Sequence, residues 1–138
     1  MNADLIILRA FESAIADAAA GLSIAYGNVK YQPQPRTLHL ESAYLPGITT
    51  NPTMGDAFSR KPGIFQVTVV APGGAGSADA FTVAGSIVAA FPRGRTVHNA
   101  DGVRVIVAGS TSVAKGFTDE PWFRVPVSIY FSADIQSA

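Results

Sequence analysis

The chain has 138 residues, enough for one domain with a hydrophobic core; 48% of them are hydrophobic and 14% are charged. Ten Lys and Arg residues balance ten Asp and Glu residues, and this net charge of zero argues against a nucleic-acid-binding module or an anionic membrane partner. The absence of cysteine excludes disulfides and thiolate chemistry. The small number of charges gives little electrostatic repulsion between copies of the chain. We therefore expect other subunits to cover part of the surface.

The N-terminal segment predicts an amphipathic helix from about Ala3 to Ala20. Gly21 stands where helices commonly end. Apolar residues recur at three- and four-residue steps and form a stripe of Leu5, Leu8, Phe11, Ile15, Ala18 and Leu22. Asp4 replaces the basic start of a signal peptide, and no apolar run approaches the roughly 20 residues that cross a bilayer. We therefore expect a protein made inside the cell, without a membrane partner.

Five later stretches predict strands. They are Leu22–Tyr26, Thr37–Leu45, Gly63–Ala71, Val103–Ala108 and Trp122–Phe131. In the longer ones apolar residues alternate with polar residues, as in strands that bury one face. The last stretch contains Pro126, which cannot donate a ladder hydrogen bond, so we expect it at a sheet edge or with a bulge.

A second helix is predicted after the glycine-rich segment PGGAGS (Pro72–Ser77). Ser77 occupies a plausible N-cap position, and Pro92 cannot continue the helix. Its buried stripe is predicted to contain Phe81, Ala84, Ile87 or Val88, and Phe91. The element order α-β-β-β-α-β-β predicts an α+β fold, with a mainly antiparallel sheet of about four to five strands and two helices packed on one face. No linker divides residues 1–138, which we expect to form a single domain.

Residues capable of catalysis or metal binding form no recognisable constellation. His39 is predicted on the outward face of its strand and His98 in a turn, and neither has the spacing of a metal site. The segment 72–77 could bind an anion at a helix start, but it lacks the lysine and the spacing of phosphate-binding loops. Arg93 and Arg95 follow the second helix, whose dipole favours cations there. We predict no catalytic residue, metal or cofactor; a small metabolite-binding domain using 72–77 and Arg93 is the alternative.

The segment GITTNPTMGDAFSRK (Gly47–Lys61) is unusually long for a connection between two neighbouring strands. A turn of two to five residues would be enough, whereas this segment has fifteen. It contains Ile48, Met54 and Phe58 but only three charged residues, and disordered segments are normally rich in charge. Two interpretations remain open: an arm at residues 47–62 that docks on a neighbouring subunit, or a surface loop folded back on its own domain.

Short motifs follow one another in order along nearly the whole chain: LSIAYGNVKYQP, NPTMGD, GIFQVTVVAPGGAG, AFPRG and a final WFRVPVSIYF. Together they resemble the tail-terminator (tail tube capping) proteins of long-tailed, non-contractile phages. The resemblance implies an α+β protein that forms a hexameric ring on the head-proximal end of the tail tube. Such a ring ends tube polymerisation and provides the surface that joins the tail to the head.

The resemblance also implies the partners of this protein. It would be a structural virion protein, made in the host cytoplasm, that contacts copies of itself, the tail tube protein and a head-completion or neck protein. DNA would pass the lumen without sequence-specific binding. The residues expected at the interface with the next subunit or the tube are Asn51, Pro52, Met54, Gly55, Asp56 and Phe58, with Arg60 and Lys61 at its rim. Another neck or tail-tube component of related fold is the alternative.

Overall fold

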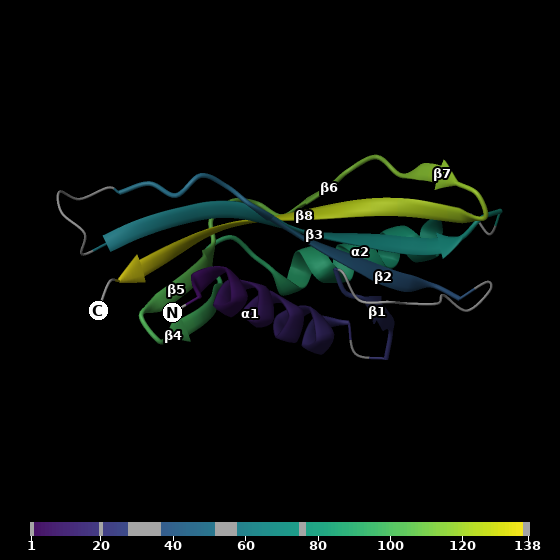
Figure 1. Ribbon diagram of the computed structural model, residues 1–138. Helices are drawn as coiled ribbons and strands as arrows, with labels where there is room; N and C mark the ends of the chain where they lie inside the picture. The colour runs from purple at the N-terminus through teal and green to yellow at the C-terminus, as the bar shows by residue number, and fades with distance from the viewer. Residues whose placement is uncertain (1, 20, 28–36, 52–57, 75–76, 137–138) are drawn as a thin grey trace.

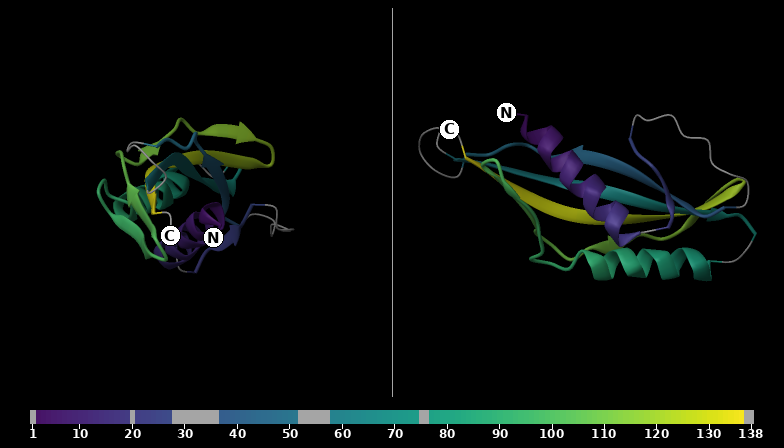
Figure 2. Two further views of the ribbon diagram at one scale, coloured as in Figure 1. Left: turned by 60° about the vertical axis from the view of Figure 1, so that its left-hand side comes forward. Right: turned by 90° about the horizontal axis from the view of Figure 1, so that it is seen from below.

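A computed structural model describes residues 2–19, 21–27, 37–51, 58–74 and 77–136. It forms one curled sheet with two helices on its concave side (Figures 1 and 2). The elements in chain order are α1 (Ala3–Ala18), β1 (Ser23–Ala25), β2 (His39–Pro46), β3 (Phe58–Pro72), α2 (Ala78–Ala90), β4 (Thr96–Ala100), β5 (Val103–Val107), β6 (Ser112–Val113), β7 (Phe117–Asp119) and β8 (Trp122–Gln136). The strands pair in the order β1-β2-β3-β8-β5-β4, and β6 and β7 also pair with β8.

The predicted α+β class with two helices is confirmed, but the predicted number of strands is wrong. The described sheet has eight strands, and it is mixed because β1 pairs with β2 in parallel. Strands β4, β6 and β7 were missed because they are short and largely exposed, so burial imposes no alternation on their sequences. His98 consequently lies in β4 and not in a turn; the turn follows at Asp101 and Gly102, which have φ values of 57° and 73°.

Helix α1 is rotated relative to the predicted stripe. It starts at the Asn2 cap, whose side chain accepts a hydrogen bond from the Leu5 amide, and it ends two residues earlier than predicted. Its buried residues are Ile7, Phe11, Ala14 and Ile15. Leu5, expected in the core, is 39% exposed. Residues 5–8 are all apolar, so packing against the sheet and not periodicity selects the buried side.

Helix α2 presents small residues to the sheet. Ala80, Ala84 and Ile87 are buried, whereas Phe81, expected in the stripe, is 43% exposed. Alanines allow the helix to approach the strands closely, which a phenylalanine at the same place would prevent. Ser77 occupies the N-cap, as predicted, but its side chain makes no capping hydrogen bond.

The prediction of an edge position for the strand that contains Pro126 is wrong, because this strand is central. β8 pairs with β3 along its whole length, and its other side pairs in turn with β7, β6 and β5. Pro126 lies between the part paired with β7 and the part paired with β6, where its carbonyl accepts a hydrogen bond from the Ala114 amide. Pro126 has no N–H to donate, but it lies where β8 changes its pairing partner from β7 to β6. The missing donor therefore costs little stability there.

The core lies between the helices and the concave face of the sheet. Phe11 of α1 stacks on Phe65 of β3 at a centroid distance of 5.0 Å and lies 5.2 Å from the ring of Phe131 in β8. Phe91, directly after α2, lies 6.3 Å from Phe11. All four rings are almost fully buried, so a single aromatic cluster joins both helical segments to the two longest strands.

Candidate interaction site: the arm between β2 and β3

One side of the arm (residues 47–62) is strand, because residues 58–62 belong to β3, whereas on the other side, over residues 47–51, only Thr50 forms a bridge, to Arg60. β3 begins at Phe58, and the amides and carbonyls of Thr50 and Arg60 form two hydrogen bonds of 2.8 Å. We call residues 47–51 and 58–62 the stem; residues 52–57, the tip, lie outside the described residues. The stem forms because β8 continues to Gln136 and gives the early part of β3 a partner. Figure 1 shows residues 58–62 as the first part of β3, beside the last part of β8, at one end of the sheet.

Two Pro-Gly dipeptides face each other at the base of the arm. In the antiparallel register Pro46 lies opposite Gly63, and Gly47 lies opposite Pro62. A Cβ on Gly63 would lie 2.5 Å from the Phe131 ring and 2.8 Å from the Leu45 carbonyl oxygen. Each glycine therefore permits a close approach, while each proline fixes its own φ near −65°. The two dipeptides fix the direction in which the arm leaves the sheet.

Charged residues of the stem are paired with the body of the same chain. Lys61 Nζ lies 2.6 Å from Asp4 Oδ1 in the first turn of α1, and the Tyr44 hydroxyl donates a hydrogen bond of 2.7 Å to the same oxygen. Hydrogen bonds from Lys61 and then Tyr44 lower the pKa of Asp4, while burial and the bond to Asp4 raise the pKa of Tyr44. Arg60 Nε lies 2.9 Å from Asp134 Oδ1 of β8, and this hydrogen bond raises the pKa of Arg60.

The predicted interface residues fall into three groups. Asn51 is exposed on the stem and accepts a hydrogen bond of 3.1 Å from Ser59. Arg60 and Lys61 make the ion pairs described above. Pro52, Met54, Gly55 and Asp56 lie outside the described residues, as does the side chain of Phe58, whose backbone pairs with Gln136. The partners Asp4, Tyr44 and Asp134 were missed because they are distant in sequence and belong to no local pattern.

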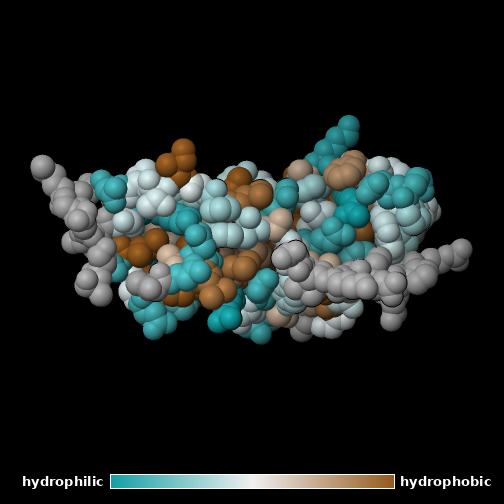
Figure 3. Space-filling view, in the orientation of Figure 1, coloured by the Kyte–Doolittle hydropathy of each residue, from teal (hydrophilic) through white to brown (hydrophobic). Residues whose placement is uncertain are grey.

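Apolar side chains remain exposed on and beside the stem. Ile48 is 84% exposed, and Leu45, at the end of β2, is 47% exposed. Figure 3 shows hydrophobic surface on the half of the molecule that bears the arm. Since the cations of the stem are satisfied within the chain, the exposed apolar groups are what this surface offers to a partner.

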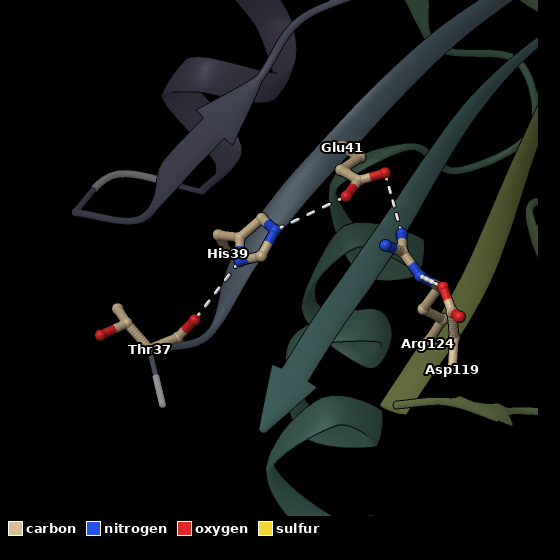
Figure 4. Close-up of polar contacts among 5 residues, drawn as sticks. All are labelled: Thr37, His39, Glu41, Asp119 and Arg124. Atoms are coloured by element: carbon tan, nitrogen blue, oxygen red, sulfur yellow. Dashed lines mark hydrogen bonds and ion pairs between the residues drawn. The ribbon is translucent and has the colours of Figure 1, made fainter. Parts of the chain in front are cut away.

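A second polar cluster lies at the opposite end of β2 (Figure 4). His39 is 1% exposed, so the prediction of a surface histidine is wrong; its ring meets the Trp122 ring edge-on at 5.0 Å. Its Nε2 lies 3.6 Å from Glu41, and Arg124 contacts both Glu41 at 2.9 Å and Asp119 at 2.8 Å. This chain of contacts ties β2 to β7 and β8. Within the described ranges, no group of three His, Asp or Glu side chains could hold a metal ion.

Comparisons with known proteins identify the family. The model of the family described as phage tail terminator protein matches residues 6–131. The chain belongs to the phage tail terminator family. The sequence resemblance is thus confirmed over nearly the whole chain. The tail terminator is a structural, non-enzymatic virion protein of the phage tail, and its family implies an interaction with the tail tube.

One solved structure supports the fold of this tail terminator. It is 32% identical in sequence, superposes with a TM-score of 0.76, and the match covers 100% of this chain and 98% of the other. No curated protein matches the chain. Among the described residues, no helix is long and apolar enough to cross a membrane.

The glycine-rich segment after β3 has a structural explanation in the tail terminator. The Gly73 amide donates a hydrogen bond of 2.8 Å to the Pro121 carbonyl, and a Cβ on Gly73 would lie 2.7 Å from that oxygen. Glycine is thus required there for the close approach of two chain segments. Nothing further supports the alternative of a metabolite-binding domain.

Proposed function

We propose that this tail terminator forms a hexameric ring that caps the head-proximal end of the tail tube in a long-tailed, non-contractile phage. The ring ends tube polymerisation and offers its other face to a head-completion or neck protein. DNA passes through the lumen without sequence-specific binding. In this proposal residues 1–138 act as one domain, and the arm makes the contact with the next subunit or with the tube.

The arm is the observation that supports this proposal most directly. Its base is fixed by the facing Pro-Gly dipeptides, and its cations are paired with Asp4 and Asp134. Ile48 is nevertheless 84% exposed on it. A segment whose base is fixed and which carries an exposed apolar residue suits a contact between subunits. We place the interface at Asn51, Pro52, Met54, Gly55, Asp56 and Phe58, with Arg60 and Lys61 at its rim.

A ring-forming terminator needs interfaces and no catalytic group. A cyclic ring is built from a head-to-tail contact, in which two different surfaces of the same chain meet and the rotation closes. The arm, at one end of the sheet and with Ile48 exposed on it, gives one such surface.

The variant Ile48→Asp tests the role of the arm. We expect its thermal unfolding to match that of the parent chain, because the side chain is 84% exposed. Its binding to tail-tube ends should weaken by about tenfold or more, since a carboxylate would be desolvated in the contact. Co-sedimentation with tubes and tube lengths in negative-stain images measure this. Val113→Asp, at a 36% exposed residue of β6, is the matched control.

A second variant replaces residues 48–61 with Asn-Gly, a pair that favours a two-residue hairpin turn. We expect a folded chain that neither assembles into rings nor stops tube growth. Normal capping by this variant and by Ile48→Asp would refute the role of the arm. Tubes that grow longer and incorporate the parent chain would instead identify a tail-tube subunit of related fold.

A further inference from the structure

An exposed arginine projects just beyond the C-terminal end of α2. The turn Pro92–Gly94 is exposed, and it is fixed by hydrogen bonds from the Gly94 amide to Val107 and from the Arg95 amide to Pro92, of 2.8 and 3.1 Å. Arg95 is committed to its own chain, since it donates to the Ala90 carbonyl and lies 4.8 Å above the Phe91 ring. Arg93 makes no ion pair or hydrogen bond within the described residues. A hydrogen-bonded turn thus presents a guanidinium that is unpaired among the described residues.

The opposite end of α2 carries a hollow with aromatic and acidic groups. The hollow has a volume of about 320 Å³ and is lined by Gly73, Gly74, Ser77, Thr118, Glu120 and Phe123. Phe81, 43% exposed, lies beside it with its ring 6.5 Å from that of Phe123. Glu120 and Asp79 are exposed, and over the described part of the chain neither forms an ion pair. The exposed Phe81 ring, the half-buried Phe123 ring and these carboxylates are a suitable environment for an arginine.

One chain cannot join these two features. They lie at opposite ends of a helix of 13 residues, which corresponds to about 20 Å. In the right-hand view of Figure 2, α2 lies along the lower edge of the molecule, with one end toward the β7 side and the other toward the middle. We infer that Arg93 of one copy docks into the hollow at the start of α2 in the next copy, as part of a head-to-tail contact. This inference rests on the proposed ring, and the arm supplies another part of the same interface.

The charges favour this pairing over the alternative of two like surfaces. The start of α2 carries about half a positive charge from the helix dipole, which alone would repel an arginine. The negative charges of Glu120 and Asp79 outweigh this partial positive charge. The C-terminal end of the neighbour's α2, which is the negative end of its dipole, approaches the same place together with Arg93. Successive α2 helices therefore run in the same direction around the ring. Arginine and aromatic residues are also enriched at the energetically dominant positions of protein interfaces.

Charge reversal with mixing tests the contact. Arg93→Glu and Glu120→Lys are made in the full chain, and ring assembly is followed by light scattering and negative-stain imaging at low salt. Each variant alone should require about tenfold or more protein to assemble, because like charges then face each other. A 1:1 mixture should recover assembly. When the two variants alternate around a ring of six, the glutamate at position 93 of one variant meets the lysine at position 120 of the other, and the arginine at position 93 meets the glutamate at position 120. Arg9→Glu, at an exposed arginine of α1, is the control and should assemble normally.

The outcomes separate this contact from the proposed function. Two results would overturn the contact alone. One is that rings form equally well in Arg93→Glu. The other is that the mixture fails to recover assembly while both variants keep the parent's thermal unfolding. A parent chain that never forms rings, even on tube ends, would overturn the proposed function and the contact together. Recovery in the mixture would also show that both variants are folded.

Discussion

At the scale of single residues, the base of the arm is held by a small polar cluster. Asp4 in α1 receives Lys61 from β3 and the Tyr44 hydroxyl from β2, so one carboxylate joins three elements. The Lys61 side chain is only 15% exposed, and its methylene groups are covered while its charge is paired. The cluster keeps a charged residue of the arm on its own subunit.

The Asp4 cluster predicts a pH dependence of stability. The pKa of Asp4 in the folded chain lies below its ordinary value of 3.8. The stabilisation that ionised Asp4 gives the fold is therefore complete at pH values above 3.8, and it is lost as the pH falls through the lowered pKa. Asp4→Asn should reduce the free energy of unfolding by roughly 0.2–1 kcal/mol at pH 7, because Asp4 is half exposed. Urea unfolding at several pH values should show this difference shrink as the pH falls below 3.8 and through the lowered pKa.

Asp17→Asn is the matched control for that prediction. Asp17 is exposed on the same helix and forms no ion pair among the residues that the structure describes. It should show no comparable loss at neutral pH. A difference for Asp4→Asn that persists unchanged at low pH would contradict the assignment of the stabilisation to the ionised carboxylate.

At the scale of elements, the arm is an extension of the sheet whose geometry depends on two glycines. Gly47 and Gly63 face prolines across the ladder, and the space that a side chain would need is already occupied on both sides. The direction in which the stem leaves β2 and enters β3 is therefore set where the arm begins. A change at this joint should alter both folding and assembly.

Gly63→Ala should destabilise the fold by about 1–3 kcal/mol, because the added methyl group would overlap the Phe131 ring and the Leu45 carbonyl. Gly85→Ala is the matched control. Gly85 lies in the interior of α2, and a Cβ added there would have no other atom within 4 Å, so alanine should stabilise by about 0.5–1 kcal/mol. Thermal or urea unfolding of the two variants should shift in opposite directions; equal shifts would refute the close packing at Gly63.

The elements also show what the sequence could predict and what it could not. Both helices and the alternating parts of β2, β3, β5 and β8 were predicted, because burial of one face leaves a local pattern. The strand character of residues 58–62 was missed, because it depends on pairing with the distant end of β8. The central position of Pro126 was missed for a similar reason, since it depends on where β6 and β7 end. At the candidate site, the sequence located the arm but not its partners Asp4 and Asp134.

At the scale of the whole molecule, one aromatic cluster unites the helices and the sheet. Phe11 contacts the rings of Phe65, Phe91 and Phe131, which belong to segments far apart in the sequence. Removing the central ring leaves a cavity that its three neighbours border, and these neighbours are fixed by the strands. The loss should therefore affect the whole fold and not one helix alone.

Phe11→Ala should lower the free energy of unfolding by about 3–5 kcal/mol, a large part of the usual total of about 5–15 kcal/mol. Leu5→Ala, on the same helix but 39% exposed, should cost much less. The sequence pattern placed both residues in one buried stripe, so the comparison tests the observed rotation of α1. Urea unfolding followed by circular dichroism measures both, and similar losses would contradict that rotation.

The position of β8 has a consequence for the synthesis of the protein on the ribosome. β1, β2 and β3 pair only with one another until β8 is present, and β4 and β5 do likewise, because β8 alone connects the two groups. β8 is also the last of the described strands to be synthesised. Two partial sheets must therefore wait for the synthesis of β8 before they can join. A nascent chain exposes the edges of both during that interval, which is when premature association with other copies is to be expected.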